Sequence, residues 1–545
     1  MDDGQSNAMN FTTSKEVSAF FAKDYPLIKL FRYGNDILLY DAKPHCAFII
    51  SNPELEVLTE FLAGKPASEM EEIHAATLGH DFIRQLIAKY RELQSCGVFI
   101  KGLVDEISSG ERDVLKKQLT YFDENIVLRK FCLEVTEDCN YRCTYCKNTI
   151  ATENRRHSKT YLSAENAFKG IDYYFHKYVT IFAKLGEAKK VLLLEIAPPS
   201  LSWYGGEPFL NFDLVKKSAA YFKDLPWDKY GIGRNNIRFS INTNLSIIDD
   251  EILNFLVDHK VHLYASLDGP QEEHDKCRVF GNGTGTFAKA YHNLQKIKEY
   301  NEIYFKEKVT IFGVYTTKHD YHKCLDFICN LGACDFRQFP AAYSGVFVPN
   351  IESETREYHR ALSNNLADFK NNVRAKLPDF DKHIDYFSNL LKFGDLKDDN
   401  PVGYNFLKTL ITCPMGFDNL MVAANGNYLI CHKTDGSMPI GDCMSGLDFE
   451  KITDLYQRYN RNINNPECRN CWNVRFCKAC AAMRMNSNRF FNPTQKECDF
   501  FRLQTTYDFL CFSYLSIEHP ELLEKILVYK NDRTRYISHI DVNEL

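Results

Sequence analysis

The middle of the chain alternates between short apolar runs and longer amphipathic segments, and this alternation limits the folds open to it. The apolar runs are LRKFCLEVT (128–136), SLSWYG (200–205), NIRFSINTN (236–244), VHLYASLDG (261–269), VTIFGVYT (309–316) and CDFRQFPA (334–341). Segments with helical spacing lie between them, at 164–179, 211–224, 249–259, 285–300 and 319–331. Strands that alternate with helices form parallel sheets with crossover helices. We therefore expect an α/β sheet or partial barrel over 130–345, with ligands beyond the carboxyl ends of its strands.

Nineteen cysteines are an unusual number for a chain of 545 residues. The sequence shows no secretion signal and no run of about 18 apolar residues, so we expect a cytoplasmic protein with no membrane partner. In a reducing compartment, closely spaced thiols more often bind metal than form disulfides. Ten of the cysteines fall into two spacing patterns. The other nine are expected to be buried small side chains: Cys46, Cys96, Cys132, Cys277, Cys324, Cys329, Cys334, Cys443 and Cys511.

The first cysteine set is Cys139, Cys143 and Cys146, in the segment EVTEDCNYRCTYCKN. It follows the first predicted strand and so begins a loop at the carboxyl end of that strand. Soft thiolates suit iron–sulfur clusters, and three of them hold three irons of a 4Fe–4S cube. The fourth iron is then open to chelation by the amine and carboxylate of an amino acid. A zinc site or a chance spacing is the alternative.

This Cys-x3-Cys-x2-Cys spacing, with Tyr145 before the last cysteine, resembles the radical S-adenosylmethionine (SAM) superfamily. The resemblance implies a partial (β/α)6 barrel, one SAM-binding 4Fe–4S cluster and bound SAM, with Tyr145 at the cofactor. The stretch WYGGEP (203–208) resembles the superfamily's segment that holds the methionyl amine. There, Gly205 and Gly206 would let the backbone approach the ligand, and Glu207 would accept from the ammonium. A plain turn is the alternative.

Short polar residues end the next two predicted strands, in SINTN (240–244) and SLDG (266–269). The resemblance places Asn242, Ser266 and Asp268 where the ribose and carboxylate of SAM are bound. Arg278 would pair with the methionine carboxylate. A surface salt bridge is the alternative for this arginine.

The second cysteine set runs from residue 413 to residue 498. Its members are Cys413, Cys431, Cys468, Cys471, Cys477, Cys480 and Cys498. Zinc ribbons usually separate two Cys-x2-Cys pairs by about 15–20 residues, and here the gap is only five. The pattern instead resembles the SPASM extension of radical SAM enzymes, which carries two auxiliary 4Fe–4S clusters.

The SPASM resemblance also divides the second set between its two clusters. It assigns Cys468, Cys471, Cys477 and Cys498 to the outer cluster, and Cys413, Cys431 and Cys480 to the inner one. The chain departs from the usual pattern because two residues, not three, precede the fourth clustered cysteine. The inner cluster lacks a fourth cysteine, so either Cys443 is its last ligand or one iron is open to a substrate thiol.

The N-terminal region has three short apolar runs, LIKLF (27–31), DILLYD (36–41) and CAFII (46–50), followed by helical spacing at 53–63 and 79–94. These runs predict a small antiparallel sheet. The unit resembles the winged-helix-like α+β recognition domain of ribosomal-peptide maturases, which binds a leader peptide as an added strand. A unit that only packs on the barrel is the alternative.

Domain limits follow from these patterns. Residues 1–9 (MDDGQSNAM) are interpreted as the remnant of an expression vector. The region after 410 has little periodicity, so we expect metal to stabilise it. The expected divisions are a recognition domain (10–104), a linker helix (105–129), the barrel (130–345), a helical bridge (346–410), a SPASM domain (411–500) and a helical tail (501–545).

The function implied is that of a radical SAM maturase that forms a cysteine thioether crosslink on a leader-bearing precursor peptide. A carbon–carbon crosslink and formylglycine formation, as in anaerobic sulfatase maturation, are the enzyme alternatives. The sulfatase maturases carry an aspartate base directly after the second SPASM cysteine, where this chain has His432. A histidine can serve as a base near neutral pH.

Two hypotheses without catalysis remain: the chain is an iron–sulfur electron carrier, or it is a zinc-binding interaction protein. The expected electron donor for the enzyme is a flavodoxin or ferredoxin. A net charge of −6 gives no support for a nucleic-acid partner.

Overall fold

A computed structural model describes residues 15–103, 112–150, 156–315 and 415–528, apart from residues 45 and 478, and short pieces between 319 and 374. Its centre is a ten-stranded, mainly parallel sheet with the order β13-β12-β11-β10-β4-β5-β6-β7-β8-β9. The six middle strands are β4 (Lys130–Thr136), β5 (Ser200–Gly205), β6 (Arg238–Thr243), β7 (His262–Ser266), β8 (Val309–Tyr315) and β9 (Asp335–Pro340). All six pair in parallel in chain order. The predicted α/β fold is therefore confirmed.

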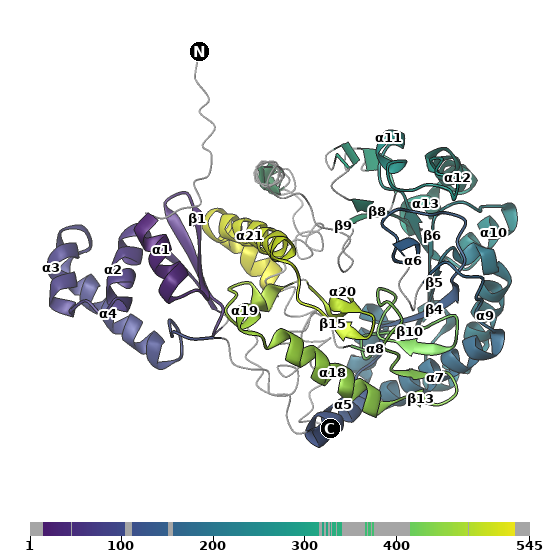
Figure 1. Cartoon of the computed structure of the whole chain (residues 1–545), viewed down its shortest axis with the longest axis horizontal. Coiled ribbons are helices and arrows are strands. Elements are labelled where there is room, and N and C mark those ends of the chain that lie inside the picture. The colour runs from purple at the N-terminus through teal and green to yellow at the C-terminus, as the bar shows by residue number, and fades with distance from the viewer. Residues whose placement is uncertain are drawn as a thin grey trace, which may run out of the picture.

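Helices join these strands and cover one face of the sheet. They are α7 (Ala164–Ala183), α8 (Glu187–Ile196), α9 (Phe212–Asp224), α10 (Asp250–Asp258), α12 (Phe287–Tyr300) and α13 (Glu302–Lys308). Short helices α6 (Lys147–Ile150) and α11 (Gln271–His274) lie in the loops. Figure 1 shows α9, α10 and α12 outside the strands, at the right of the molecule.

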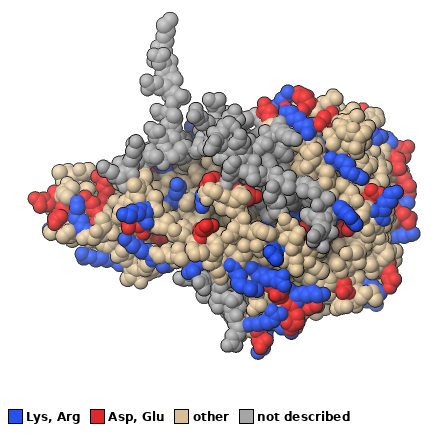
Figure 2. All heavy atoms as spheres, viewed as in Figure 1, with Lys and Arg blue, Asp and Glu red and all other residues tan. Residues whose placement is uncertain are grey.

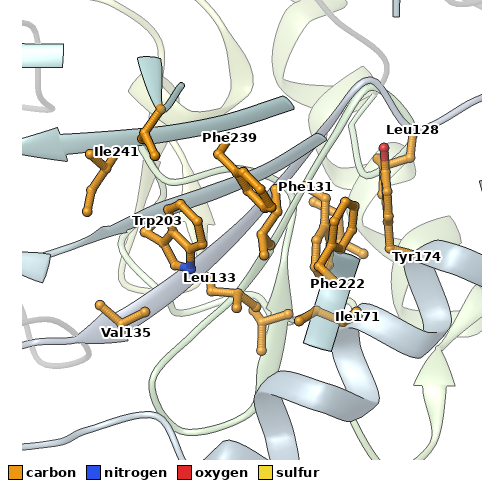
Figure 3. Close-up of a cluster of buried hydrophobic side chains, with 14 of the residues drawn as sticks. Leu128, Phe131, Leu133, Val135, Ile171, Tyr174, Trp203, Phe222, Phe239 and Ile241 are labelled. Atoms are coloured by element: carbon orange, nitrogen blue, oxygen red, sulfur yellow. The ribbon is translucent and has the colours of Figure 1, made fainter. Parts of the chain in front are cut away.

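The main hydrophobic core lies between the sheet and these helices. Alternate residues of a strand point to opposite faces, and Phe131, Leu133 and Val135 of β4 all face the helices (Figure 3). Phe131 stacks on Tyr174 of α7 with ring centroids 5.0 Å apart. Trp203 of β5 is fully buried and stacks on Phe239 of β6.

The opposite face of the sheet, here called the inner face, is polar. Ser202 and Ser240 share a hydrogen bond of 2.8 Å across β5 and β6. His262 and Thr310 form another of 2.8 Å across β7 and β8. An inner face of this kind can contact a polar ligand, while the helix-covered face supplies the stability.

Four further strands extend the sheet beyond β4. They are β10 (Asn419–Val422), β11 (Asn427–Leu429), β12 (Gly441–Asp442) and β13 (Gly446–Leu447). β10 pairs with β4 in parallel, and the rest are antiparallel. Helix α18 (Phe449–Ile463) follows and buries Ile452, Leu455, Tyr456, Tyr459 and Ile463 in the main core. The expectation that the region after 410 depends on metal is therefore wrong for 415–463, because this segment shares the core of the barrel.

The N-terminal unit contains α1 (Lys15–Asp24), then β1 (Ile28–Tyr33), β2 (Asp36–Asp41) and β3 (Cys46–Ser51), then α2 (Asn52–Leu62), α3 (Ala67–Leu78) and α4 (His80–Ser95). The three predicted strands form an antiparallel sheet in the order β1-β2-β3. Ser51 and Glu54 form a capping box that begins α2. The helices cover one face of this sheet and form a core of their own.

Two long helices connect these parts. α5 (Arg112–Asn125) occupies the expected linker, and α21 (Gln495–Glu518) runs through the expected boundary at residue 500. α21 lies beside β1 of the N-terminal unit (Figure 1). The small elements near it are α19 (Pro466–Arg469), α20 (Ala481–Arg484), β14 (Met485–Asn486) and β15 (Arg489–Phe490). The expected bridge at 346–410 lies mostly outside the described residues.

The scattered cysteines follow the burial expectation only in part. Cys277, Cys324, Cys443 and Cys511 are buried. Cys46 and Cys132 are partly buried, and Cys96 is exposed because it follows the end of α4 at the surface. Cys329 and Cys334 lie outside the described residues.

The apolar length of the helices and the charge of the surface both concern possible partners. Among the described residues, no helix is both long and apolar enough to cross a membrane. Positive and negative side chains are interspersed on the face that Figure 2 shows.

Candidate active site at the carboxyl ends of the parallel strands

The loop that carries Cys139, Cys143 and Cys146 leaves the carboxyl end of β4. The segment 277–280 holds it in place by backbone bonds, from Arg142 N to Val279 O at 2.7 Å and from Thr144 N to Cys277 O at 2.9 Å. Cys139 and Cys143 are buried in this loop. The fold thus fixes the cysteine loop through ordinary protein contacts.

The three thiols lie close to one another. Burial raises the pKa of Cys139 and of Cys143 to about 12, and neighbouring thiols of the same loop add to both increases. Burial also acts to raise the pKa of Cys146, yet hydrogen bonds from His157 and from the backbone N–H of Asn148 outweigh it and lower this pKa to about 7. The three predicted cysteines belong to one small cluster of side chains. Among the described residues, no three Cys, His, Asp or Glu side chains are arranged to hold a single metal ion.

The two glycines of WYGGEP serve the packing of the protein itself. Gly206 N donates to Thr136 O at 2.9 Å, and a Cβ on Gly206 would lie 2.0 Å from Asp138 O. Gly205 has φ +145°, and its Cβ would lie 2.2 Å from Thr136 O. The close approach that requires glycine here joins the loops after β4 and β5, and the expected approach to a ligand stays a prediction.

Glu207 is fully buried and binds other loops of the protein. Its Oε1 accepts from Phe209 N at 3.1 Å and from Thr243 Oγ1 at 2.9 Å, and its Oε2 accepts from Asn244 N at 2.7 Å. Burial raises the pKa of Glu207 to about 7. The carboxyl group therefore ties the β5 loop to the β6 loop, and its expected contact with an ammonium stays a prediction.

Asn244 is a site residue that the sequence analysis missed. Its Nδ2 donates to Cys139 Sγ at 3.5 Å and to Asn140 Oδ1 at 3.0 Å, and Ser246 Oγ donates to the same Asn140 oxygen. The predicted residues Asn242 and Ser266 are partly buried and lie on the inner face of the sheet, in β6 and β7. A polar residue just beyond the strand end was the signal for Asn244.

Tyr145, Asp268 and Arg278 form one hydrogen-bonded group. Tyr145 Oη donates to Asp268 Oδ2 at 2.7 Å and accepts from Arg278 Nη1 at 2.7 Å, while Arg278 Nη1 lies 3.7 Å from Asp268 Oδ1. Three predicted cofactor residues from three segments thus meet. The surface salt bridge considered for Arg278 is wrong, because this side chain is buried.

His274 contacts the Tyr145–Asp268–Arg278 group through the backbone of Asp268. Its Nδ1 accepts from Asp268 N at 3.3 Å and its Nε2 bonds to Thr286 Oγ1 at 3.0 Å. Burial lowers the pKa of His274 well below its ordinary value, with the charge of Arg278 adding to the effect. A neutral imidazole therefore holds the end of β7.

The donor set of the cysteine loop fits an iron–sulfur cluster with an anionic ligand. Three adjacent thiols supply soft ligands, and Arg278 supplies a buried positive charge beside Cys143. Among the described residues, the buried atoms Arg278 Nε and Tyr141 Oη have no hydrogen-bond partner. Buried polar atoms of this kind normally have partners, so a bound polar group is expected here.

Four cysteines of the second set also lie together, from α19, the following loop and the first turn of α21. Burial raises the pKa of Cys477, and the nearby thiols of Cys471 and Cys468 raise it further. Burial raises the pKa of Cys498 to about 11, with the same neighbours adding to it. These are the four residues predicted for one cluster.

The remaining candidates are more dispersed. Cys431 follows β11, Cys480 precedes α20, and Cys413 lies outside the described residues. Cys443 lies in the main core beside Gly170 of α7, on the helix-covered face of the sheet. The ring of His432 lies 4.8 Å from the ring of Tyr204, which is on the inner face. Cys443 and His432 are therefore on opposite faces.

Comparison with known proteins finds similarity over the region of the parallel strands. Residues 133–328 match the Radical SAM superfamily. The radical SAM cyclopropyl synthase TigE of Paramaledivibacter caminithermalis is 25% identical over 215 residues, which are 37% of this chain and 40% of that protein. A cysteine-type anaerobic sulfatase-maturating enzyme of Clostridium novyi is 26% identical over 185 residues, 34% of this chain and 43% of that one. The chain thus spans less than half the length of these two relatives.

Solved structures show more distant likenesses. Native anSMEcpe with bound AdoMet has a TM-score of 0.49 and 17% identity, over 73% of this chain and 99% of that one. Streptococcus suis SuiB bound to precursor peptide SuiA has a TM-score of 0.41 and 13% identity, over 86% and 98% of the two chains.

Proposed function

We propose that the chain is a radical SAM enzyme that forms a cysteine thioether crosslink in a ribosomally made precursor peptide. The observation that carries the proposal is the meeting of the buried Cys139–Cys146 loop with the Tyr145–Asp268–Arg278 group. When bound, the 4Fe–4S cluster and SAM supply a 5′-deoxyadenosyl radical that removes a hydrogen atom from an unactivated carbon.

The residues of the site have distinct roles in this proposal. Cys139, Cys143 and Cys146 hold the cluster, and Asn244 donates to the sulfur of Cys139. Arg278 pairs with the carboxylate of methionine, and Tyr145 and Asp268 keep its guanidinium in place. Asn242 and Ser266, on the inner face, contact the ribose. Gly205, Gly206 and Glu207 bring the strand ends together, so their role is positioning.

The second cysteine set supports two auxiliary clusters. Cys468, Cys471, Cys477 and Cys498 hold the outer one, in keeping with the proximity of their thiols. Cys413, Cys431 and Cys480 hold the inner one. Cys443 is left out because it lies in the core on the other face of the sheet. An iron without a fourth protein ligand can bind the substrate thiol, and this favours a thioether product.

The N-terminal unit is the proposed site for the leader of the precursor peptide. Its sheet ends in the edge strand β3, on which Ile49 is exposed. An edge strand can pair with an extended peptide by backbone hydrogen bonds. A flavodoxin or ferredoxin is the proposed electron donor, and the cytoplasm is the proposed compartment.

Formylglycine formation is the second candidate function. Relatives named sulfatase-maturating enzymes match this chain, and His432 lies on the inner-face side beside Tyr204. In formylglycine formation, His432 would be the base that accepts a proton from the substrate. A carbon–carbon crosslink is the third possibility.

One experiment separates these functions. The reconstituted protein is incubated with SAM, dithionite and either cysteine-containing precursor peptides or a sulfatase-derived peptide. A thioether removes two hydrogen atoms and blocks the thiol against iodoacetamide. A carbon–carbon crosslink removes two hydrogen atoms and leaves the thiol reactive, and formylglycine gives an aldehyde that reacts with a hydrazide. A thiol still reactive after the two-hydrogen loss would reject the thioether.

A further inference from the structure

Two arginines donate to sulfur atoms of the second cysteine set, and neither belongs to a recognisable sequence motif. Arg484 Nη2 lies 3.9 Å from Cys468 Sγ, and Arg502 Nη2 lies 3.5 Å from Cys471 Sγ. Both distances are within the range of hydrogen bonds to sulfur. The two cations come from different elements, the end of α20 and the second turn of α21.

Each guanidinium is held in position by further contacts. Arg484 donates through Nε to Ala479 O at 3.1 Å and through Nη1 to Asn462 Oδ1 at 3.0 Å, and its side chain is buried. Arg502 donates through Nη1 to Asp499 Oδ1 at 2.8 Å and keeps 29% of its side chain exposed. The Nη2 of each arginine is thereby directed at a sulfur atom.

The N-terminal sheet covers this cysteine set with apolar groups. Trp472, next to Cys471, packs against Phe31 of β1 with ring centroids 5.6 Å apart, and Phe31 stacks on Phe509 of α21 at 4.4 Å. Lys29 lies over the ring of Trp472, and burial lowers the pKa of its amine, with the charge of Arg502 adding to this. Charges act more strongly in such a partly dehydrated place than in water.

We propose that Arg484 and Arg502 raise the reduction potential of the iron–sulfur cluster that Cys468, Cys471, Cys477 and Cys498 hold. The proposal rests on the proposed function for the cluster itself. A one-electron reduction adds one negative charge to the cluster, and nearby cations and N–H···S bonds stabilise that charge. The cluster that the four thiolates hold is therefore reduced more easily.

The test uses the full chain with Cys139→Ala, Cys143→Ala and Cys146→Ala, reconstituted with iron and sulfide. Only the auxiliary clusters then remain, with about eight irons expected for two cubes. Midpoint potentials are measured by dithionite titration with electron paramagnetic resonance detection. Arg502→Gln removes the charge, Arg502→Lys keeps it, and Arg484→Gln is a second removal. Arg461→Gln is the matched control, because this exposed arginine of α18 donates to the backbone oxygen of Gln457 within its own helix.

The expected result is that Arg502→Gln shifts one of the two couples about tenfold toward the oxidised form at a fixed potential, which is about 59 mV for one electron. Arg502→Lys shifts it less, and Arg461→Gln leaves both couples unchanged. Should Arg502→Gln lose iron, Arg484→Gln decides the question by the same shift. Unmoved potentials at full iron content would overturn the role of the arginines alone. About four irons or fewer in the parent protein would overturn the cluster assignment as well.

Discussion

The two cysteine-bearing regions of the molecule are built in different ways. The Cys139–Cys146 loop projects from the end of a central strand, and hydrogen bonds from the loops of β5, β6 and β7 hold its surroundings. The Cys468–Cys498 region consists of the short helices α19 and α20, turns and the start of α21. The first region is shaped by the fold before any metal binds. The second packs its buried residues Trp472 and Val474 in a small core shared with the N-terminal sheet. It otherwise consists of turns and short helices, so we expect it to depend more on its ligands.

This difference predicts which region responds to metal. A preformed site gains little backbone order on binding, whereas a loop-rich site gains much of its folding free energy from the metal. Stability of the first region should therefore respond to substitutions in the protein. Stability of the second should respond to iron.

Removal of iron is expected to have the largest effect. Amide hydrogen exchange in residues 466–480 should accelerate more than about a thousandfold in the apoprotein, equivalent to about 4 kcal/mol. Exchange in 130–136 and 238–243 should change far less, because these strands lie in the main core. Mass spectrometry of apo and reconstituted protein measures both. Equal acceleration in the two regions would show that they depend on iron to the same extent.

The substitution Arg278→Met should destabilise the first region by about 3–4 kcal/mol, because it leaves the buried Asp268 carboxyl without its cation. Urea unfolding of the apoprotein, followed by the fluorescence of the core residues Trp203 and Trp227, measures this. The control Arg458→Met breaks an exposed pair with Asp454 and should cost about 0.5 kcal/mol or less. Similar losses of unfolding free energy in the two variants would show that the Tyr145–Asp268–Arg278 group is not formed before metal binds.

The substitution Gly206→Ala tests the contact between the β4 and β5 loops. The added Cβ would lie 2.0 Å from Asp138 O, so the backbone must shift, and a loss of about 3 kcal/mol is expected. Gly186→Ala, where a Cβ meets nothing within 4 Å, should change stability by a few tenths of a kcal/mol. Thermal unfolding compares the two, and a tolerated Gly206→Ala would show that the loops adjust freely.

The pH dependence of the first region should report on Glu207. Its pKa is about 7 when folded, because burial raises it above the ordinary value of 4.5. Between these values the folded state keeps a proton that the unfolded chain has lost, so the free energy of unfolding falls as pH rises. At about 1.4 kcal/mol per pKa unit, the total change in the free energy of unfolding is about 3–4 kcal/mol. Glu207→Gln should remove this slope in urea unfolding of the apoprotein, and an unchanged slope would assign it to other groups.

The sequence predicted the strands better than it predicted the contacts at their ends. Each strand carries alternating apolar residues that face the helices, so all six could be recognised from the local sequence. The three donors to Glu207 come from residues 209, 243 and 244, and such partners depend on how loops meet in space. The apolar spacing of α18 was present in the sequence but was set aside because cysteine and asparagine dominate that region. Arg484 and Arg502 had no motif to mark them.

We propose that the Cys139–Cys146 loop starts radical chemistry and that the second cysteine set holds separate clusters. Anaerobic reconstitution, iron and sulfide analysis, and mass spectrometry of 5′-deoxyadenosine after addition of dithionite and SAM test it most directly. About twelve irons are expected for three cubes in the wild type. Nucleoside is expected from the wild type and from a Cys96→Ala control, and none from the Cys139→Ala, Cys143→Ala, Cys146→Ala variant. Nucleoside formation by that triple variant, or a wild type with full clusters that forms none, would show that radical chemistry does not start at this loop.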